Sequence, residues 1–149
     1  AGSGTPLTPQ DLGASLASAG QGAYLAILTY LPDEPALFDV LEEFAKAVRE
    51  HFDLPVTLNP GPRYLHSTGQ LHKGGSPHGL FLFVRSVPER DLDIFDEDFG
   101  FAHLNRAQAE GDRVVLTDRG RAVYSIELVG PTMSCVAQLR GALASILSV

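Results

Sequence analysis

The sequence predicts an α/β protein: a three-layer α/β/α sandwich with a mainly parallel sheet. Segments of strand length alternate along the chain with segments of helical periodicity, which is the pattern of repeated β-α-β units. The strand-like segments are nearly continuous apolar runs, as expected for strands that are covered on both faces. A chain of 149 residues has the size of one domain. We assign residues 1–7 to a flexible leader and residues 8–149 to this domain.

A short helix and a strand open the domain. Thr8 is suited to cap a helix whose first turn contains Pro9 and whose inward side chains are Leu12 and Leu16. The apolar run 23–31 then has the length of a strand, and it stops at a proline that ends the pattern.

An amphipathic helix and a second strand follow. Pro35 suits the first turn of this helix, and four apolar side chains lie at helical spacing after it. They are Leu37, Leu41, Phe44 and Val48. Residues 55–59 are the second predicted strand.

The second half of the chain supplies two more strands and two more helices. The strands are residues 79–87 and 121–129, and the acidic segment 88–98 is expected to be a solvated loop. The helix after this loop is expected to end at Gly111 and to turn three side chains inward: Phe101, Leu104 and Ala107. The closing helix has four apolar side chains on one face: Val136, Leu139, Leu143 and Ile146.

Composition and charge exclude several classes of protein. A formal net charge of −7 argues against a nucleic-acid or anionic-membrane partner. The single cysteine, Cys135, cannot form an internal disulfide, and its apolar neighbours predict a buried, inert thiol. No segment approaches the roughly 18 apolar residues that span a bilayer, and the N-terminus lacks the features of a signal peptide. We therefore expect a cytoplasmic protein.

One stretch, residues 66–75 (HSTGQLHKGG), gathers proton carriers and hydrogen-bond donors. It lies in the longest interval without an acidic residue, between Asp53 and Glu89, which also contains Arg63 and Arg85. The stretch follows a predicted strand, in the kind of place where parallel sheets bind ligands. A phosphate or another small anion would be favoured here, although the exclusion of acids from two buried strands would leave the same gap.

The histidines of this interval favour proton transfer over metal binding. His66 can donate and accept a proton near neutral pH, and Ser67 and Thr68 can cap a helix whose free N–H groups favour an anion. A purely structural interpretation also remains open, in which these two residues only cap a helix and His66 bonds a backbone carbonyl. His66, His72 and His78 recur every sixth residue, which is not the spacing of one helical face, so we expect no metal.

Nucleotide and hydrolase motifs are absent from the sequence. The spacing of a phosphate-binding P-loop, a glycine-rich dinucleotide fingerprint and a nucleophile elbow do not occur. We therefore expect no cofactor.

Three segments resemble the C-terminal part of phosphoglucose isomerases: GPRYLHSTGQLHKGG (61–75), GLFLFV (79–84) and FGFAHLNRAQAEGD (99–112). The resemblance is nearest to the isomerase half of fused transaldolase/glucose-6-phosphate isomerase proteins, and it runs from about residue 8 to residue 148. The first segment is specific, whereas the rest is ordinary α/β patterning. The resemblance implies a sugar-isomerase (SIS) fold of flavodoxin-like type. A complete isomerase has two such subdomains, and this chain has the length of one.

The resemblance also implies residue roles. The family's ring-opening histidine stands in a His-x-x-x-Gln-Leu context, which residues 66–71 match, so His66 is the expected catalytic residue. The expected substrate-binding residues are Arg63, Ser67, Thr68, Gln70 and Lys73. In the family this histidine is contributed across a dimer interface, which makes a homodimer the expected assembly.

Other parts of the family's active site have no counterpart in the sequence. No glutamate stands in the context of the family's base, and the helix that carries a lysine in the family has Arg106 instead. The phosphate-binding residues belong to the other subdomain. We therefore expect the C-terminal part of a glucose-6-phosphate isomerase, which interconverts glucose 6-phosphate and fructose 6-phosphate, is inactive alone, and needs an upstream isomerase or transaldolase portion. The alternative is a non-catalytic module that binds a phosphorylated sugar.

Overall fold

A sheet of four parallel strands forms the centre of the protein, as shown by a computed structural model that describes residues 7–63, 74–88 and 92–149. The strands are β1 (Tyr24–Tyr30), β2 (Val56–Pro60), β3 (Gly79–Val87) and β4 (Ala122–Val129). Their order across the sheet is β2-β1-β3-β4, which is the order of the first four strands of a flavodoxin-like sheet. The four predicted strands are thus confirmed, to within one residue at each end.

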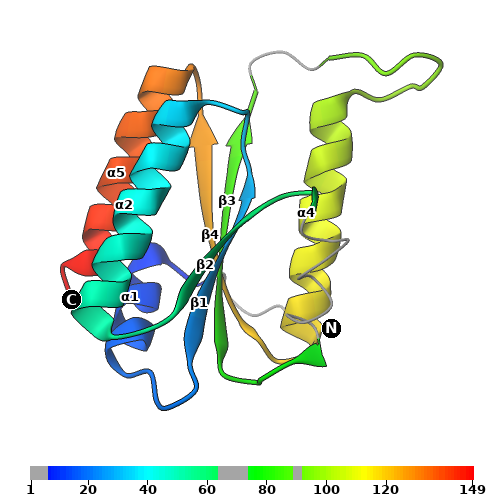
Figure 1. Cartoon of the computed structure of the whole chain (residues 1–149). Coiled ribbons are helices and arrows are strands. Elements are labelled where there is room, and N and C mark those ends of the chain that lie inside the picture. The colour runs from blue at the N-terminus through cyan, green and yellow to red at the C-terminus, as the bar shows by residue number, and fades with distance from the viewer. Residues whose placement is uncertain (1–6, 64–73, 89–91) are drawn as a thin grey trace.

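Helices cover both faces of this sheet, but unequally (Figure 1). The helices of the described ranges are α1 (Pro9–Ala17), α2 (Pro35–Phe52), α4 (Phe101–Asp118) and α5 (Thr132–Leu147). Three of them, α1, α2 and α5, lie on one face, and α4 lies on the other. The three-layer α/β/α sandwich predicted from the sequence is confirmed.

Alternate side chains of the central strands enter two separate apolar clusters, because neighbouring residues of a strand point to opposite faces. Leu25 and Ile27 of β1 join the larger cluster, under α1, α2 and α5. Ala26 and Leu28 join the smaller cluster, under α4. All four side chains are 0% exposed. Because β1 is covered on both faces, nearly all of its residues are apolar.

The N-terminal helix begins as predicted. The Thr8 hydroxyl accepts a hydrogen bond from the Asp11 backbone N–H at 3.2 Å, and the Asp11 carboxylate accepts one from the Thr8 N–H at 2.6 Å. This reciprocal pair is a capping box. Leu12 and Leu16 are buried, and a methyl group on Gly13 would lie 2.6 Å from the carbonyl oxygen of Ile146. Gly13 is therefore the contact point at which the backbones of α1 and α5 pack closely.

Most of the predicted inward side chains of α2 and α5 are buried. All four of α2 are at most 3% exposed: Leu37, Leu41, Phe44 and Val48. In α5, three of the four are buried, Leu139, Leu143 and Ile146, and Val136 packs against the same cluster while partly exposed. None of the helices in the described ranges is long and apolar enough to cross a bilayer.

The prediction for α4 is wrong in two respects. The helix does not end at Gly111 but continues to Asp118, because Leu116, which is 0% exposed, anchors its last turns in the smaller cluster. That burial outweighs the cost of about 1 kcal/mol for a glycine inside a helix. The inward residues are also different: Ala109, Asp112 and Leu116 are buried, whereas Phe101, Leu104 and Ala107 are not. The reason is that the first turns of α4 line a pocket rather than cover the strands.

Candidate functional site

A pocket of about 720 Å³ opens beyond the carboxyl ends of the strands. The chain leaves β1 toward α2 on one face and leaves β3 toward α4 on the other, so the connections that follow these neighbouring strands diverge at this end. Such a switch point is where open α/β sheets bind ligands. Residues that end all four strands or follow them line the pocket, among them Tyr30, Gly61, Arg85 and Glu127.

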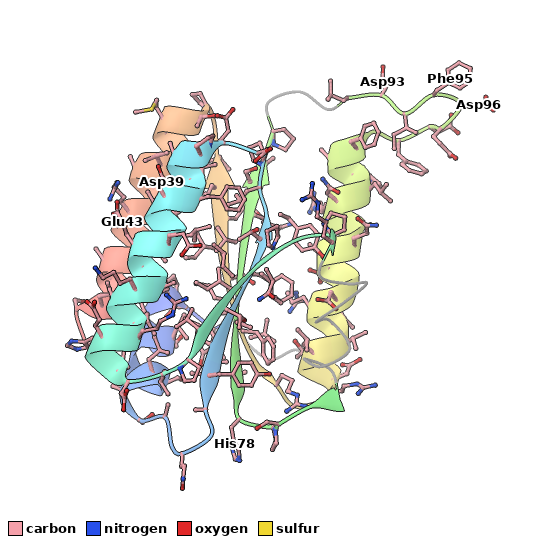
Figure 2. The ribbon with its side chains drawn as sticks, viewed as in Figure 1. Asp39, Glu43, His78, Asp93, Phe95 and Asp96 are labelled. Atoms are coloured by element: carbon pink, nitrogen blue, oxygen red, sulfur yellow. The ribbon has the colours of Figure 1, made fainter. Side chains whose placement is uncertain are left out.

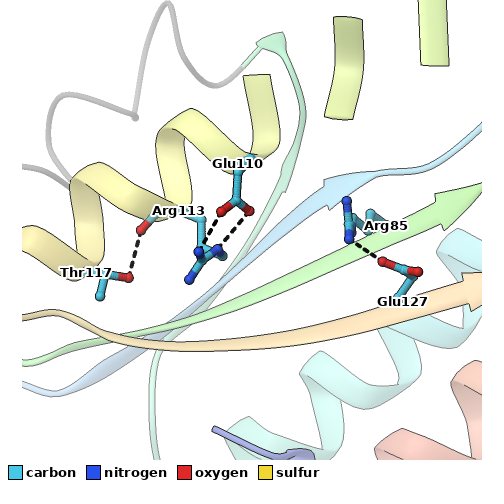
Figure 3. A network of polar contacts seen from close by, with 5 residues as sticks. All are labelled: Arg85, Glu110, Arg113, Thr117 and Glu127. Carbon is cyan, nitrogen blue, oxygen red and sulfur yellow. Dashed lines mark hydrogen bonds and ion pairs between the residues drawn. The ribbon is translucent and has the colours of Figure 1, made fainter. Parts of the chain in front are cut away.

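An ion pair crosses the floor of this pocket (Figure 3). Arg85 of β3 and Glu127 of β4 are direct partners in the parallel register, and the Arg85 guanidinium donates a hydrogen bond to the Glu127 carboxylate. Both side chains project to the α4 side of the sheet, the side to which Phe81 and Phe83 of the smaller cluster also point. Their side chains remain 29% and 45% exposed, so this pair is accessible to a ligand in the pocket.

The first turns of α4 add two further groups that carry or accept a proton. His103 and Arg106 line the pocket, three residues apart and therefore on one face of the helix. The His103 ring lies 5.8 Å from the Phe99 ring, centroid to centroid. On the opposite wall, Glu34 occupies the N-cap position of α2 without a side-chain capping bond. The pocket therefore contains two arginines, a histidine and two carboxylates.

A second ion pair lies on α4, further from the pocket (Figure 3). Arg113 donates two hydrogen bonds to the Glu110 carboxylate, from Nε at 2.9 Å and from Nη2 at 2.6 Å. These bonds lower the pKa of Glu110, and the charges of Arg113, Arg85 and Arg106 lower it further. The charges of the two pocket arginines thus favour the ionised form of Glu110.

Cys135 lies in the wall of the pocket but is only 3% exposed. Its thiol donates a hydrogen bond to the Gly130 carbonyl oxygen at 3.4 Å. Burial raises the pKa of the Cys135 thiol, which keeps it in the unreactive protonated form at neutral pH. The predicted burial of this cysteine is confirmed.

The raised pKa of Cys135 makes the stability of the fold depend on pH in the alkaline range. Burial favours the neutral thiol, so its contribution to stability is complete below the unfolded pKa of about 8.5 and is lost as the pH rises through the higher folded value. Urea unfolding of the wild type and of Cys135→Ala should show this. Between pH 7.5 and pH 10, the wild type is expected to lose more stability than the variant; an equal loss in both would contradict the assignment.

The structure describes one of the six predicted site residues. Arg63 is exposed and follows the end of β2 closely, two residues after Gly61 of the pocket wall. The other five lie outside the described residues: His66, Ser67, Thr68, Gln70 and Lys73. Their mutual arrangement is therefore still a prediction.

The connection that contains these residues joins opposite ends of the sheet. It leaves the carboxyl end of β2 at Pro60 and reaches the amino end of β3 at Gly79. Gly75 and Ser76 lie shortly before β3. Their carbonyl oxygens accept hydrogen bonds from the Arg121 side chain, at 2.8 Å for Gly75 and 2.6 Å for Ser76. The beginning of the 61–78 connection is thus next to the pocket. The hydrogen bonds from Arg121 hold its last part at the other end of the sheet, where the strands begin.

Sequence reasoning did not select His103, Arg106, Glu127 or Arg85 as site residues. The signal for the first two was available, because both stand in the first turns of the helix that follows β3. The pairing of Arg85 with Glu127 depends on the register of β3 and β4, which no spacing along the chain reveals. Within the described ranges, no three histidine, cysteine, aspartate or glutamate side chains converge on a metal site.

Comparisons with known proteins agree on the fold and give no family. No protein-family model matches the sequence, and no curated protein does. Two solved structures that match are a hypothetical protein from Thermus thermophilus (TM-score 0.68, 18% identity) and a candidate sugar-binding protein from Salmonella typhimurium (TM-score 0.54, 15% identity). The matches cover 94% and 95% of this chain but 39% and 41% of those chains. The chain thus spans about two fifths of the length of each, and at these identities the likeness shows the fold alone.

Proposed function

We propose that this chain is the C-terminal part of a cytoplasmic glucose-6-phosphate isomerase and that it binds the phosphorylated sugar in the pocket beyond β1 and β3. The observation that carries the proposal is the position of the pocket. Its wall includes Gly61, and the isomerase-like segment 61–75 begins at that residue. Arg85 and Arg106 give the pocket the donors that an anionic sugar needs.

The residues of the site suit a reaction in which protons move at neutral pH. His66, five positions after Gly61, is proposed to transfer a proton at the ring oxygen as the sugar opens, a step that an imidazole can catalyse near its unperturbed pKa. Arg106, in the helix that carries a lysine in the family, is proposed to contact the substrate from α4. No described residue is assigned as the base that moves the proton between C1 and C2.

The proposed enzyme needs a further portion that lies outside this chain. Both matched structures are more than twice as long as the segment that resembles this chain. An upstream isomerase or transaldolase portion would supply the base and further phosphate-binding residues beside Arg85 and Arg106, and the resemblance implies a homodimer. The isolated chain is therefore expected to bind the sugar weakly and to show no turnover of fructose 6-phosphate above the buffer rate.

Binding to the isolated chain tests the role of the pocket. NMR titration should show that fructose 6-phosphate binds more tightly than fructose, and that Arg106→Gln weakens the phosphate-dependent part about 10-fold, since a hydrogen bond to a charged group contributes about 1.5–3 kcal/mol. Arg140→Gln is the matched control, because Arg140 pairs with Glu43 on the opposite helical layer. Equal binding of both sugars, or equal effects of the two substitutions, would contradict the proposal.

The second candidate function is a non-catalytic module that holds a phosphorylated sugar. The description of one matched structure as a candidate sugar-binding protein favours it. Turnover separates the two functions: the enzyme part gains activity when it is joined to the upstream portion, whereas the module binds the sugar and never turns it over.

A further inference from the structure

The segment after β3 forms a projecting arm, residues 92–100. Asp93 and Gly100 form an antiparallel bridge at its base, where the Phe101 N–H also donates to the Leu92 carbonyl oxygen at 2.9 Å. At its tip, the Glu97 N–H donates to the Ile94 carbonyl oxygen at 3.2 Å. Figures 1 and 2 show the arm extending away from the rest of the protein, with Phe95 and Asp96 at its far end. The arm is thus closed by hydrogen bonds of its own, without packing on the core.

Exposed apolar side chains are concentrated at this end of the protein. Phe95 is 98% exposed and Leu92 is 72% exposed. Seven of the eleven large exposed apolar side chains in the described ranges lie in the arm, beside it, or at the carboxyl ends of β3 and β4: Val87, Leu92, Phe95, Phe99, Phe101, Val129 and Met133. A patch of this kind on a protein with well-buried cores indicates an interaction surface.

The seven side chains form two groups with complementary electrostatic surroundings. The arm contains four carboxylates, and no ion pair or side-chain hydrogen bond joins them to another described residue: Asp93, Asp96, Glu97 and Asp98. The second group includes Val129 and Met133, at the start of α5. That helix begins at Thr132, and it has Pro131 as its N-cap residue, no side-chain capping bond and no acidic residue in its first turn. Its positive dipole end is therefore uncompensated and attracts carboxylates.

The two groups cannot meet within one molecule. The arm extends beyond the α4 side of the sheet, while the start of α5 lies on the other side (Figure 1). One chain therefore has both partners of a complementary contact, the acidic arm and the start of α5, but the two are too far apart to touch each other. A second copy related by a two-fold axis would bring each arm to the other copy's α5, and the contact would form twice.

We propose that this face is the interface of a homodimer, in which the arm of each copy lies against the α5 N-terminus of the other. Phe95 packs beside Met133 and Val129 of the second copy, and the carboxylates of the arm face the helix dipole. The proposal names a surface for the dimer that the family resemblance implies, but it rests on the exposure and charge of this face and not on the proposed function. The pockets of both copies lie next to such an interface, because Leu92 and Thr132 line them.

Sedimentation equilibrium of the chain tests this proposal. The wild type is expected to be a dimer, and Phe95→Asp and Met133→Asp are each expected to raise its dissociation constant at least about 100-fold, because each substitution damages two buried contacts in a two-fold interface. Val115→Asp is the matched control. It adds the same charge to an exposed apolar position of α4 outside the surface, 37% exposed, and is expected to leave the dissociation constant unchanged.

A mixture of the two weakened variants makes the test specific. A heterodimer of Phe95→Asp with Met133→Asp keeps one of its two contacts entirely wild-type, so the mixture is expected to associate more tightly than either variant alone. Circular dichroism checks that each variant is folded. A monomeric wild type, a dimer insensitive to both substitutions, or a mixture no tighter than its components would overturn the proposal. Sugar binding, measured separately on the same samples, shows whether the proposed function fails independently.

Discussion

Replacing Phe81 with alanine is expected to lower the free energy of unfolding by about 3–5 kcal/mol. Phe81 is 0% exposed and lies in the smaller apolar cluster, with its ring 6.0 Å from the ring of Tyr24 in an edge-to-face arrangement. Among the helices of the described ranges, α4 is the one that covers this cluster, so few of their side chains can move into the cavity that the substitution leaves. A domain of this size is stable by only about 5–15 kcal/mol. The variant should therefore unfold at a much lower urea concentration.

Phe99→Ala is the control for this prediction. It removes the same ring from a position in the arm that is 39% exposed, outside both apolar clusters. Its effect on the free energy of unfolding should be small, about 0.5 kcal/mol or less, as for surface substitutions in general. If both variants unfolded at the same urea concentration, the smaller cluster would not contribute the stability that its burial implies.

Replacing His66 with alanine is expected to reduce the turnover number about 100- to 10,000-fold, the range for loss of a general acid or base, in an enzyme assembled from this chain and the upstream portion. The effect should appear mainly in kcat, because the histidine is proposed to act in the chemical step, while KM changes little. Isomerisation of fructose 6-phosphate to glucose 6-phosphate measures it directly.

His72→Ala is the matched control, since it removes the same side chain six positions further along the sequence. Its turnover number should stay within a factor of about 3 of the wild type, because no role in the reaction is proposed for His72 and substitutions away from functional contacts usually change free energies by no more than about 0.5 kcal/mol. Equal losses in the two variants would show that the two histidines do not differ in their contribution to turnover. An unchanged turnover number in His66→Ala would exclude the proposed proton transfer.

The sequence predicted those elements of the fold in which local pattern and burial agree. β3 was predicted at residues 79–87, as observed, because its apolar run is bounded by Gly79 and by a proline after Val87. The inward face of α2 was predicted because that helix is strongly amphipathic and packs along its whole length. α4 was mispredicted because its first turns face a pocket, so the apolar pattern of Phe101 and Leu104 does not mark a core face.

The site was less predictable than the fold. The sequence indicated the carboxyl ends of the strands as the binding edge, and the pocket lies there. The charged groups that line it come from β3, β4 and α4, and only the register of the sheet brings Arg85 opposite Glu127. The exposed surface of the arm was also beyond prediction, since residues 88–98 read as an ordinary acidic loop, and Phe95 at its tip has no local pattern that marks it as exposed.

The strand order has a consequence for how the chain folds during synthesis. β1 lies between β2 and β3 and pairs with both, so its second partner is made more than 50 residues after it: Tyr24 pairs with Gly79. β3 in turn waits for β4, whose Ala122 pairs with Leu80. Such long-range parallel pairing slows folding and leaves apolar strand edges open on the growing chain. A nascent chain that has not yet reached residue 122 leaves the edge of β3 without its partner strand, and such an edge can pair with another chain.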